Sequence, residues 1–365
     1  MAEIKINHLF KRYNPDSPLA VDDVNMTIAD GEFLVLLGPS GCGKTTTLRC
    51  VAGLEHQTDG DIFIGDQLVN GLPAGERDIA FVFQFYALYP HMNAFDNISF
   101  PLRAQKVHKD EVTKRVLAVA KLLQIEHLLR RKPAGLPSGE QQRIALGRAI
   151  IRRPQVFLMD EPLTNLDATL RIDMRAELKL LQADLKTTMI YVTHDQTEAM
   201  SMGHRIAIMN EGVLQQMDAP LTVYNHPATK FVAGFIGSPP MNFVDCQVSD
   251  DGIMDAAGTF TLPADHVPDL QARAGQSETN ELVFGVRSED VVLTTAVSDC
   301  DVRGQILVRE PLGDEMIYTI EVAEHTIQAK TEPTFILDPG DNVGLSFDPQ
   351  RIHLFDAQTE LALVA

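Results

Sequence analysis

The chain has 365 residues, a length that suits about two domains. Hydrophobic residues make up 45% of it and charged residues 22%, so both domains can bury a core and the protein is expected to be soluble and globular. The formal net charge of −19 argues against general nucleic-acid binding, because an acidic surface repels phosphate backbones.

Two further features of the composition concern the membrane and the redox environment. No stretch approaches the roughly 18 consecutive apolar residues of a spanning helix, and the start MAEIKINHLF lacks the pattern of a signal peptide. Contact with a membrane is therefore expected through a partner. The cysteines are scattered and form no C-x-x-C pair, so a reducing cytoplasm is a simpler interpretation than a disulfide or zinc site. They are Cys42, Cys50, Cys246 and Cys300.

The first part of the chain, to about residue 235, is expected to be an α/β domain. Short, wholly apolar segments predict strands of a parallel sheet covered on both faces, at residues 33–37, 156–159 and 189–192. A Gly-rich turn and a helix starting near Lys44 follow the first strand. Asp160 and Glu161 follow the second, and Thr193 and His194 follow the third. Ligands of α/β folds bind at such carboxyl ends.

The remaining segments differ in character. Residues 95–153 are rich in Leu, Arg and Lys and are expected to form a helical subdomain. From about residue 240, short alternating segments among Gly, Pro and Asp turns predict a small all-β domain, a barrel or a sandwich. The junction 237–240 (GSPP) is a plausible hinge. We therefore expect domains at 1–237 and 238–365.

The turn after the first strand fits the phosphate-binding pattern G-x-x-x-x-G-K-[ST]. Glycines let backbone N–H groups turn inward around phosphates, and the helix N-terminus adds its dipole. Lys44 would reach the β- and γ-phosphates, and the Thr45 hydroxyl would bind Mg²⁺. The alternative is an ordinary Gly-rich turn. The residues of this loop are Gly38, Pro39, Ser40, Gly41, Cys42, Gly43, Lys44, Thr45 and Thr46.

Other polar residues complete the predicted site. Asp160 would hold Mg²⁺ through water, and Glu161 would act as general base toward the attacking water, the alternative being two surface acids. His194 could hydrogen-bond the γ-phosphate, although a lone histidine is as often structural. Gln84 could bind Mg²⁺ or the attacking water instead of being a solvated loop amide. Tyr13 could stack on adenine or be a partly buried core tyrosine.

With these residues in place, the sequence resembles the ATP-binding subunits of ABC importers, most closely the carbohydrate-uptake group with the maltose and glycerol-3-phosphate transporter ATPases. The likeness covers nearly the whole chain. It implies a P-loop ABC ATPase fold followed by an OB-like (TOBE-type) regulatory domain. Tyr13 matches the adenine-stacking position, Gln84 the Q-loop and VFLMDEP (156–162) the Walker B segment, with Glu161 as catalytic glutamate. Asp167 falls in the D-loop and His194 at the switch histidine.

The same resemblance implies partners and location. Residues 85–92 (FYALYPHM) look like the surface that receives the permease's coupling helix, although composition alone would allow a merely structural aromatic turn. Two permease subunits, a second ATPase subunit and, indirectly, a solute-binding protein follow from the likeness. It places the chain on the cytoplasmic face of the inner (plasma) membrane as a peripheral subunit. ATP and Mg²⁺ are the implied substrate and cofactor.

One segment departs from the family. The signature LSGGQ is replaced by LPSGE (136–140), with matching sequence on both sides, so Ser138 and Gly139 are its candidate nucleotide-binding residues. Pro137 offers neither hydroxyl nor N–H, though its φ suits a helix start. Glu140 adds negative charge near a triphosphate. Losing one such donor costs about 10²–10³ in rate, so the chain is expected to complete a neighbour's site poorly.

These observations leave more than one function open. The chain is interpreted as the ATP-hydrolysing subunit of an importer for a carbohydrate, polyol or glycerol-type solute. It would act either as half of an asymmetric heterodimer with an intact paralogue or as a homodimer of reduced turnover. A transporter of another small solute and a regulatory ATP-binding protein remain alternatives. A soluble ABC ATPase acting on nucleic acid is disfavoured by the single ATPase domain, the lack of a long heptad run and the negative charge.

Overall fold

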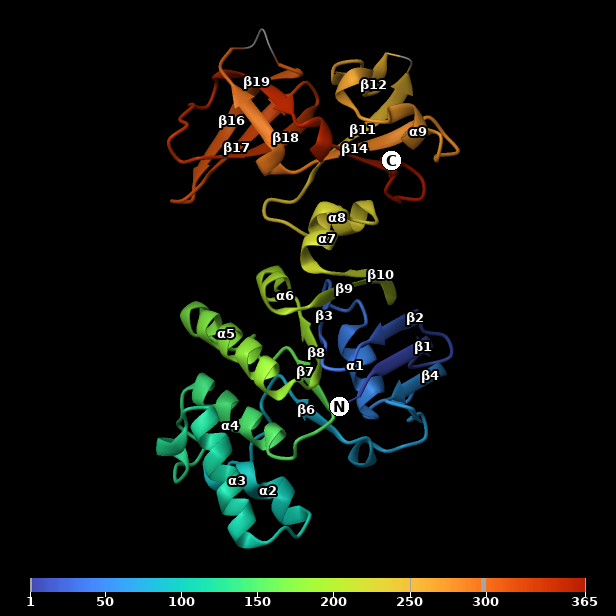
Figure 1. Ribbon diagram of the computed structural model, residues 1–365. Helices are drawn as coiled ribbons and strands as arrows, with labels where there is room; N and C mark the ends of the chain where they lie inside the picture. Colours follow the sequence, from blue (N-terminus) through green and yellow to red (C-terminus); the bar gives the residue numbers. More distant parts are fainter. Residues whose placement is uncertain (1, 250, 297–299, 365) are drawn as a thin grey trace. The chain divides into compact units, whose positions relative to one another are not determined.

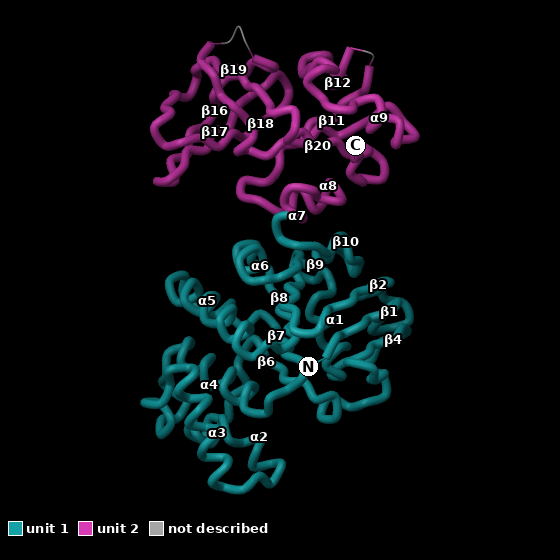
Figure 2. The backbone as a smooth tube through the Cα atoms, in the orientation of Figure 1, with its two compact units in different colours: residues 1–221 teal, residues 222–365 magenta. Residues whose placement is uncertain are grey.

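The computed structural model describes residues 2–249, 251–296 and 300–364 and divides into two compact units, residues 1–221 and 222–365 (Figure 2). We call them unit 1 and unit 2. No helix in the described ranges is long and apolar enough to span a membrane.

Unit 1 is built around a six-stranded sheet of order β10-β9-β3-β8-β7-β6, parallel except for the antiparallel β9–β10 pair (Figure 1). Its central strands are wholly buried, which confirms the three predicted strands. The strands are β3 (Phe33–Leu37), β6 (Ile79–Val82), β7 (Val156–Asp160), β8 (Thr188–Thr193), β9 (Arg205–Asn210) and β10 (Val213–Asp218).

A second, antiparallel sheet of order β2-β1-β4-β5 completes the β structure of unit 1. Its apolar side chains share one core with β3, β7, β8 and helix α1, so the phosphate-loop segment is anchored between two sheets. The elements are β1 (Ile4–Lys11), β2 (Val21–Ile28), α1 (Lys44–Ala52), β4 (Asp59–Ile64) and β5 (Gln67–Leu68).

Helices form the rest of unit 1 and confirm the predicted helical subdomain at 95–153. In Figure 1, α2, α3 and α4 gather beyond the β6 end of the large sheet. Glycine at position 147 allows close packing there, since a Cβ would meet Ile98 at 3.2 Å. The helices are α2 (Ala94–Ala104), α3 (Lys109–Leu122), α4 (Ser138–Ile150), α5 (Ala168–Leu185) and α6 (Gln196–Met202), with short 3₁₀ turns at Ala74–Glu76 and Glu126–Leu128.

Unit 2 is mostly β, as the sequence predicts, and comprises two five-stranded sheets whose inner faces share one core. Phe284 and Phe347, one from each sheet, meet at 5.3 Å between ring centroids. The first sheet contains β11 (Asn242–Ser249), β12 (Gly252–Met254), β13 (Thr261–Pro263), β14 (Glu281–Val286) and β20 (His353–Asp356). The second contains β15 (Val291–Thr294), β16 (Val302–Pro311), β17 (Met316–Val322), β18 (His325–Thr331) and β19 (Asn342–Phe347).

Short helices accompany these sheets: α7 (Pro220–Asn225), α8 (Lys230–Phe235) and α9 (Leu270–Ala274), with 3₁₀ turns at Ala264–His266, Ser288–Asp290 and Pro349–Arg351. The division after residue 221 differs from the sequence-based boundary at 237. Its physical reason is that α8 packs Ala233 against Val283 and Phe355 of the sheet.

Arg287, only 3% exposed, ties α7 to the β structure of unit 2. Its guanidinium donates to the carbonyl of Ile236 at 2.7 Å and to that of Tyr224 at 2.6 Å. It also lies 3.6 Å from the centroid of the Tyr224 ring. The arginine therefore satisfies the carbonyl of Tyr224 in α7 and that of Ile236, the C-cap of α8.

We expect Arg287→Leu to lower the free energy of unfolding by about 2–3 kcal/mol, because it removes charge-assisted hydrogen bonds and strands buried carbonyls. Urea denaturation followed by circular dichroism measures the change. Arg351→Leu is the matched control: this exposed arginine is 4.0 Å from Asp290, so its loss should cost no more than about 0.5 kcal/mol. Equal losses for the two variants would contradict the assigned role of Arg287.

Candidate active site

The loop at residues 38–46 connects β3 to α1 and takes a conformation that requires glycine. Gly43 has φ of 101°, and a Cβ there would lie 2.4 Å from the backbone oxygen of Ala20. Gly41 has φ of 82°, with nothing within 4 Å of its Cβ position. The positive φ values turn the chain tightly before α1 begins at Lys44.

Lys44 folds back over this loop. Its ammonium donates to the carbonyls of Gly38 and Pro39 at 2.8 Å each, and the side chain is 5% exposed. The carbonyl of Cys42 accepts from the Gly212 N–H at 3.1 Å, which anchors the loop to the β9–β10 turn. The first N–H groups of α1 have no partner within their own helix. The loop therefore offers these N–H donors together with the Lys44 ammonium. This cradle suits a polyphosphate.

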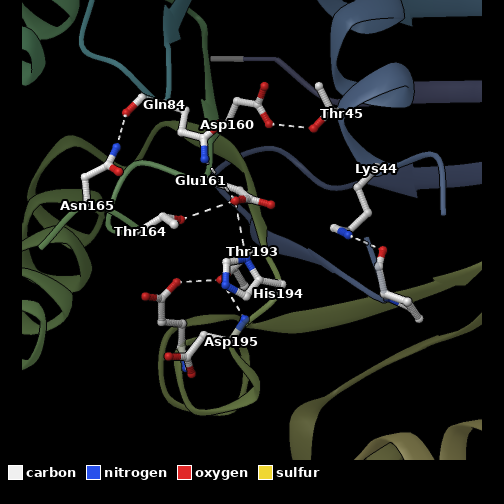
Figure 3. A network of polar contacts seen from close by, with 12 residues as sticks. Lys44, Thr45, Gln84, Asp160, Glu161, Thr164, Asn165, Thr193, His194 and Asp195 are labelled. Atoms are coloured by element: carbon white, nitrogen blue, oxygen red, sulfur yellow. Dashed lines mark hydrogen bonds and ion pairs between the residues drawn. The ribbon is translucent and has the colours of Figure 1, made fainter. Parts of the chain in front are cut away.

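The start of α1 also meets the end of β7. The Thr45 hydroxyl donates to the Asp160 carboxylate at 2.8 Å (Figure 3). Burial raises the pKa of Asp160, while the Thr45 hydrogen bond and the nearby Arg49 charge oppose that rise. A hydroxyl and a carboxylate beside a phosphate cradle are hard oxygen ligands of the kind Mg²⁺ takes together with substrate phosphates. The residues present therefore fit magnesium.

Two of the other predicted residues, Gln84 and His194, meet at Glu161 (Figure 3). Its Oε2 accepts from the Gln84 amide at 3.4 Å and from the Thr164 hydroxyl at 3.3 Å, and lies 3.3 Å from His194 Nδ1. The backbone is left-handed, with φ of 45°, and its N–H donates to the Val192 carbonyl at 3.1 Å. A strained, non-glycine backbone held by the neighbouring strand is typical of functional sites.

Sequence reasoning missed the supporting residues of this cluster. Thr164 bonds Glu161, and the Asn165 amide donates to the carbonyl of Gln84 at 3.1 Å. The Thr193 hydroxyl accepts from the Asp195 N–H at 3.0 Å and thereby shapes the turn at His194. Hydroxyl and amide residues three and four positions after a strand-ending glutamate were the available signal.

Tyr13 and Asp167 lie in different surroundings. The Tyr13 hydroxyl is 3.2 Å from Thr46 Oγ1, the side chain is 52% exposed, and the Lys11 ammonium lies 4.8 Å from the ring centroid. Tyr13 is thus beside the phosphate loop with exposed ring surface. Asp167 instead caps α5, accepting from the Leu170 N–H at 3.0 Å. Among the described residues, no recorded polar contact joins it to residues 38–46.

The altered signature begins α4 in this structure. Pro137 is the N-cap, with φ of −54°, and Ser138 is the first helical residue, as expected from the fixed φ of proline. A Cβ on Gly139 would meet Leu170 at 2.5 Å. Glu140 lies in the first turn, 3.9 Å from His127. Within the described ranges, no hydrogen bond or ion pair joins Ser138 or Gly139 to this chain's own phosphate loop.

Residues 85–92 border a groove of about 470 Å³ in unit 1. Phe85 is 78% exposed, and Arg148 of α4 donates to the carbonyls of Tyr86 and Ala87 at 2.8 and 2.7 Å. The groove walls include Tyr89 and the α2 residue Phe100. The segment contributes Ala87 and Tyr89 to the groove and is continuous in sequence with Gln84, so the groove and the candidate site share one loop.

We expect Gly43→Ala to reduce the free energy of unfolding by roughly 3 kcal/mol, because it combines left-handed strain with a clash against backbone. Gly41→Ala is the matched control, with the strain but not the clash, and should lose only about 1 kcal/mol. Urea unfolding of the two variants measures the difference. Similar losses would show that the close approach at Ala20 is not restrictive.

Comparison with known proteins gives matches along the whole chain. The ABC transporter family model matches residues 21–164, the MalK OB fold domain model matches residues 237–291, and the TOBE domain model matches residues 284–355. The chain is 49% identical to the trehalose/maltose import ATP-binding protein MalK of Thermococcus litoralis and 45% identical to the oligosaccharides import ATP-binding protein MsmX of Bacillus subtilis. Both alignments cover 100% of each chain.

A solved structure supports the same assignment for unit 1. The dimeric ATP-binding cassette MJ0796, in a post-hydrolysis state bound to ADP and Pi, is 31% identical with a TM-score of 0.54, covering 60% of this chain and 98% of that one. Together with the full-length matches, this likeness shows that the chain belongs to the ATP-hydrolysing subunits of ABC transporters, with MalK-type OB and TOBE domains following the ATPase domain.

Proposed function

We propose that this chain hydrolyses ATP to drive the uptake of a carbohydrate or a related polyol or glycerol-type solute. The observation that carries the proposal is the convergence of Gln84, Thr164 and His194 on Glu161, next to the Thr45–Asp160 pair. The names of the full-length relatives, which import trehalose, maltose or oligosaccharides, support the solute class. So does the MalK-type OB domain.

In this proposal the phosphate loop holds the triphosphate. Backbone N–H groups of residues 38–46 and the Lys44 ammonium neutralise the β- and γ-phosphates. Thr45 and Asp160, with Gln84, would hold Mg²⁺, which supplies positive charge against the phosphate oxygens. Tyr13 would stack on the adenine with its exposed face. Asp167, Ser138 and Gly139 would act across a dimer interface.

The chemistry proceeds by attack of water on the γ-phosphorus. Glu161 accepts a proton from that water as the new P–O bond forms and the bond to the ADP oxygen breaks. His194, within hydrogen-bond range of Glu161, would orient this carboxylate and contact the γ-phosphate. Gln84 is bonded to the same carboxylate and belongs to the same loop as residues 85–92. It would therefore couple movements of the groove to the position of Glu161.

The partners are those that the family resemblance implies. A coupling helix of a membrane permease would occupy the groove beside residues 85–92, and a second ATPase subunit would face the phosphate loop. A solute-binding protein would take part only through the permease. The chain would then work as a peripheral subunit on the cytoplasmic face of the plasma membrane. ATP binding can itself drive closure of the two ATPase subunits, because ATP has different affinities for their open and closed states.

We expect Glu161→Gln to lower kcat for ATP hydrolysis by about 10²–10⁴-fold, the usual contribution of a general base. Binding of Mg·ATP should change by less than about threefold, because the phosphate loop is untouched. Steady-state ATPase assays and calorimetry measure the two quantities. Glu76→Gln is the control: this exposed glutamate lies in a 3₁₀ turn away from the site, so both quantities should stay at the original value.

Solute uptake by cells carrying the variant separates transport from regulation. Loss of uptake with Glu161→Gln supports the importer. Unchanged uptake would favour the alternative, a regulatory ATP-binding protein, and would contradict the proposed coupling.

The signature leaves two arrangements open. Either the chain pairs with a paralogue carrying an intact signature, so that one site is strong and one degenerate, or it forms a homodimer of reduced turnover in which Ser138 partly replaces the lost serine. In both cases Pro137 contributes no donor, since proline lacks a backbone N–H. Glu140, in the first turn of α4, adds negative charge where a γ-phosphate would approach.

Restoring the signature tests this interpretation. The triple variant Pro137→Ser, Ser138→Gly and Glu140→Gln should raise the ATPase rate of the purified chain by about 10²-fold, the effect of regaining an anion-stabilising donor. Helix α4 should form equally well in both proteins, which circular dichroism checks. If the unmodified chain already turns over as fast as the restored one, the degenerate-site idea is wrong.

A further inference from the structure

Unit 2 contains a cavity of about 700 Å³ that has no part in the ATPase chemistry. It lies between the segment that joins α7 to α8, helix α9, residues 349–354 and residues 362–364. This volume is within the range of small-molecule sites, about 300–1,000 Å³. Its lining combines apolar and basic side chains, which suggests a particular class of ligand.

The strongest feature of the cavity is a buried arginine without an acidic partner. Arg273 is 8% exposed and donates through Nε to the carbonyl of Leu363 at 2.9 Å and through Nη2 to that of Ile352 at 3.4 Å. Nη1 has no recorded acceptor among the described residues. Burial lowers the pKa of this guanidinium, and the charge of Asp269, at the start of α9, opposes that change without forming an ion pair. Buried charges are normally paired, so this one is available to an anion.

Other basic groups surround the same space. His226 and His353 line it, and burial together with Arg287, Arg273, His226 and Arg351 lowers the pKa of His353 to about 4. No aspartate or glutamate is among the described residues that form its walls. The chain has 50 acidic and 31 basic residues. A cavity wall of basic and neutral residues therefore differs in charge from the protein as a whole. His353 is uncharged near neutral pH, so the positive charge among the described wall residues is that of Arg273, and no carboxylate of the wall offsets it.

We propose that this cavity binds a small organic oxyanion, a phosphate ester or a carboxylate, with Arg273 as its anchor. Guanidinium binds both oxyanions through two parallel hydrogen bonds, and Nη1 is the donor still available. Pro227, Pro349 and Leu354 form an apolar wall for the body of the molecule. Gln350, exposed at the rim, can hydrogen-bond hydroxyl groups. The site is separate in sequence from every residue assigned to ATP.

The absence of tryptophan from the sequence allows a site-specific readout. Gln350→Trp places a single tryptophan at the rim of the cavity in the full chain. Titration with glucose 6-phosphate, inorganic phosphate or citrate should change its fluorescence with half-saturation near or below about 1 mM. Glucose, which has no charge, should produce no change. Comparing the three anions distinguishes a phosphate ester from free phosphate and from a carboxylate. Gln358→Trp, outside the cavity, is the reporter control and should not respond.

Substitutions at Ala228 and Arg273 then test the anchor, with Ala357→Asp as the control. Ala228 is exposed on the cavity wall, so Ala228→Asp should fold normally and weaken anion binding at least tenfold by placing a carboxylate in the site. Ala357→Asp, exposed but outside the lining, adds the same charge and should leave affinity unchanged. Arg273→Gln should abolish the response, and Arg273→Lys should retain part of it.

Three outcomes overturn the proposal. One is no fluorescence response of Gln350→Trp to any of the three anions at 10 mM, roughly tenfold above the expected half-saturation. Another is a response that Ala228→Asp leaves unchanged, since the anion would then bind elsewhere, for instance at the phosphate loop. The last is an equal response to glucose, which would show that charge is not recognised. Circular dichroism of each variant separates these results from loss of fold.

Discussion

The parallel register of β3, β8 and β7 is the constraint on which the active site depends. Leu37 is paired with Thr193, and Asp160 is paired with Val192, so the three strands end within one residue of each other. The register therefore brings the phosphate loop after β3, Glu161 after β7 and His194 after β8 to one edge of the sheet. A one-residue slip of β7 against β8 would turn every side chain of β7 to the opposite face and shift Glu161 relative to His194.

This register also holds a left-handed residue in place at the candidate site. Glu161 has a left-handed backbone but donates its N–H to the neighbouring strand, so the sheet holds the side chain toward Gln84 and His194. Glycine is required at position 43 because the backbone oxygen of Ala20 lies too close to the loop for a Cβ. The rigid edge thus provides positioned donors and acceptors, the form of preorganisation that stabilises developing charge.

The charged groups of the candidate active site and those of unit 2 have different partners. In unit 1, Asp160 and Glu161 lie near the loop that carries Lys44, and in the proposed function a magnesium nucleotide would bind between them. In unit 2, the buried guanidiniums of Arg273 and Arg287 bond backbone carbonyls instead of carboxylates. Arg287 is saturated by structural contacts, including the ring of Tyr224, whereas Arg273 faces a cavity. A buried guanidinium thus stabilises the fold at Arg287 and is proposed to bind an anion at Arg273.

The sequence by itself determined the buried strands, the phosphate loop, the order of the α/β and all-β regions and the family, because hydrophobic runs, glycine spacing and short motifs are local properties. It also identified Gln84, Glu161 and His194 as candidates. Only the tertiary structure brought Thr164 into contact with Glu161, placed α8 and the last residues of α7 in unit 2, and showed that Nη1 of Arg273 has no recorded acceptor among the described residues. These features depend on contacts between segments far apart in the chain or on the exact turn of a backbone, and no local pattern encodes either.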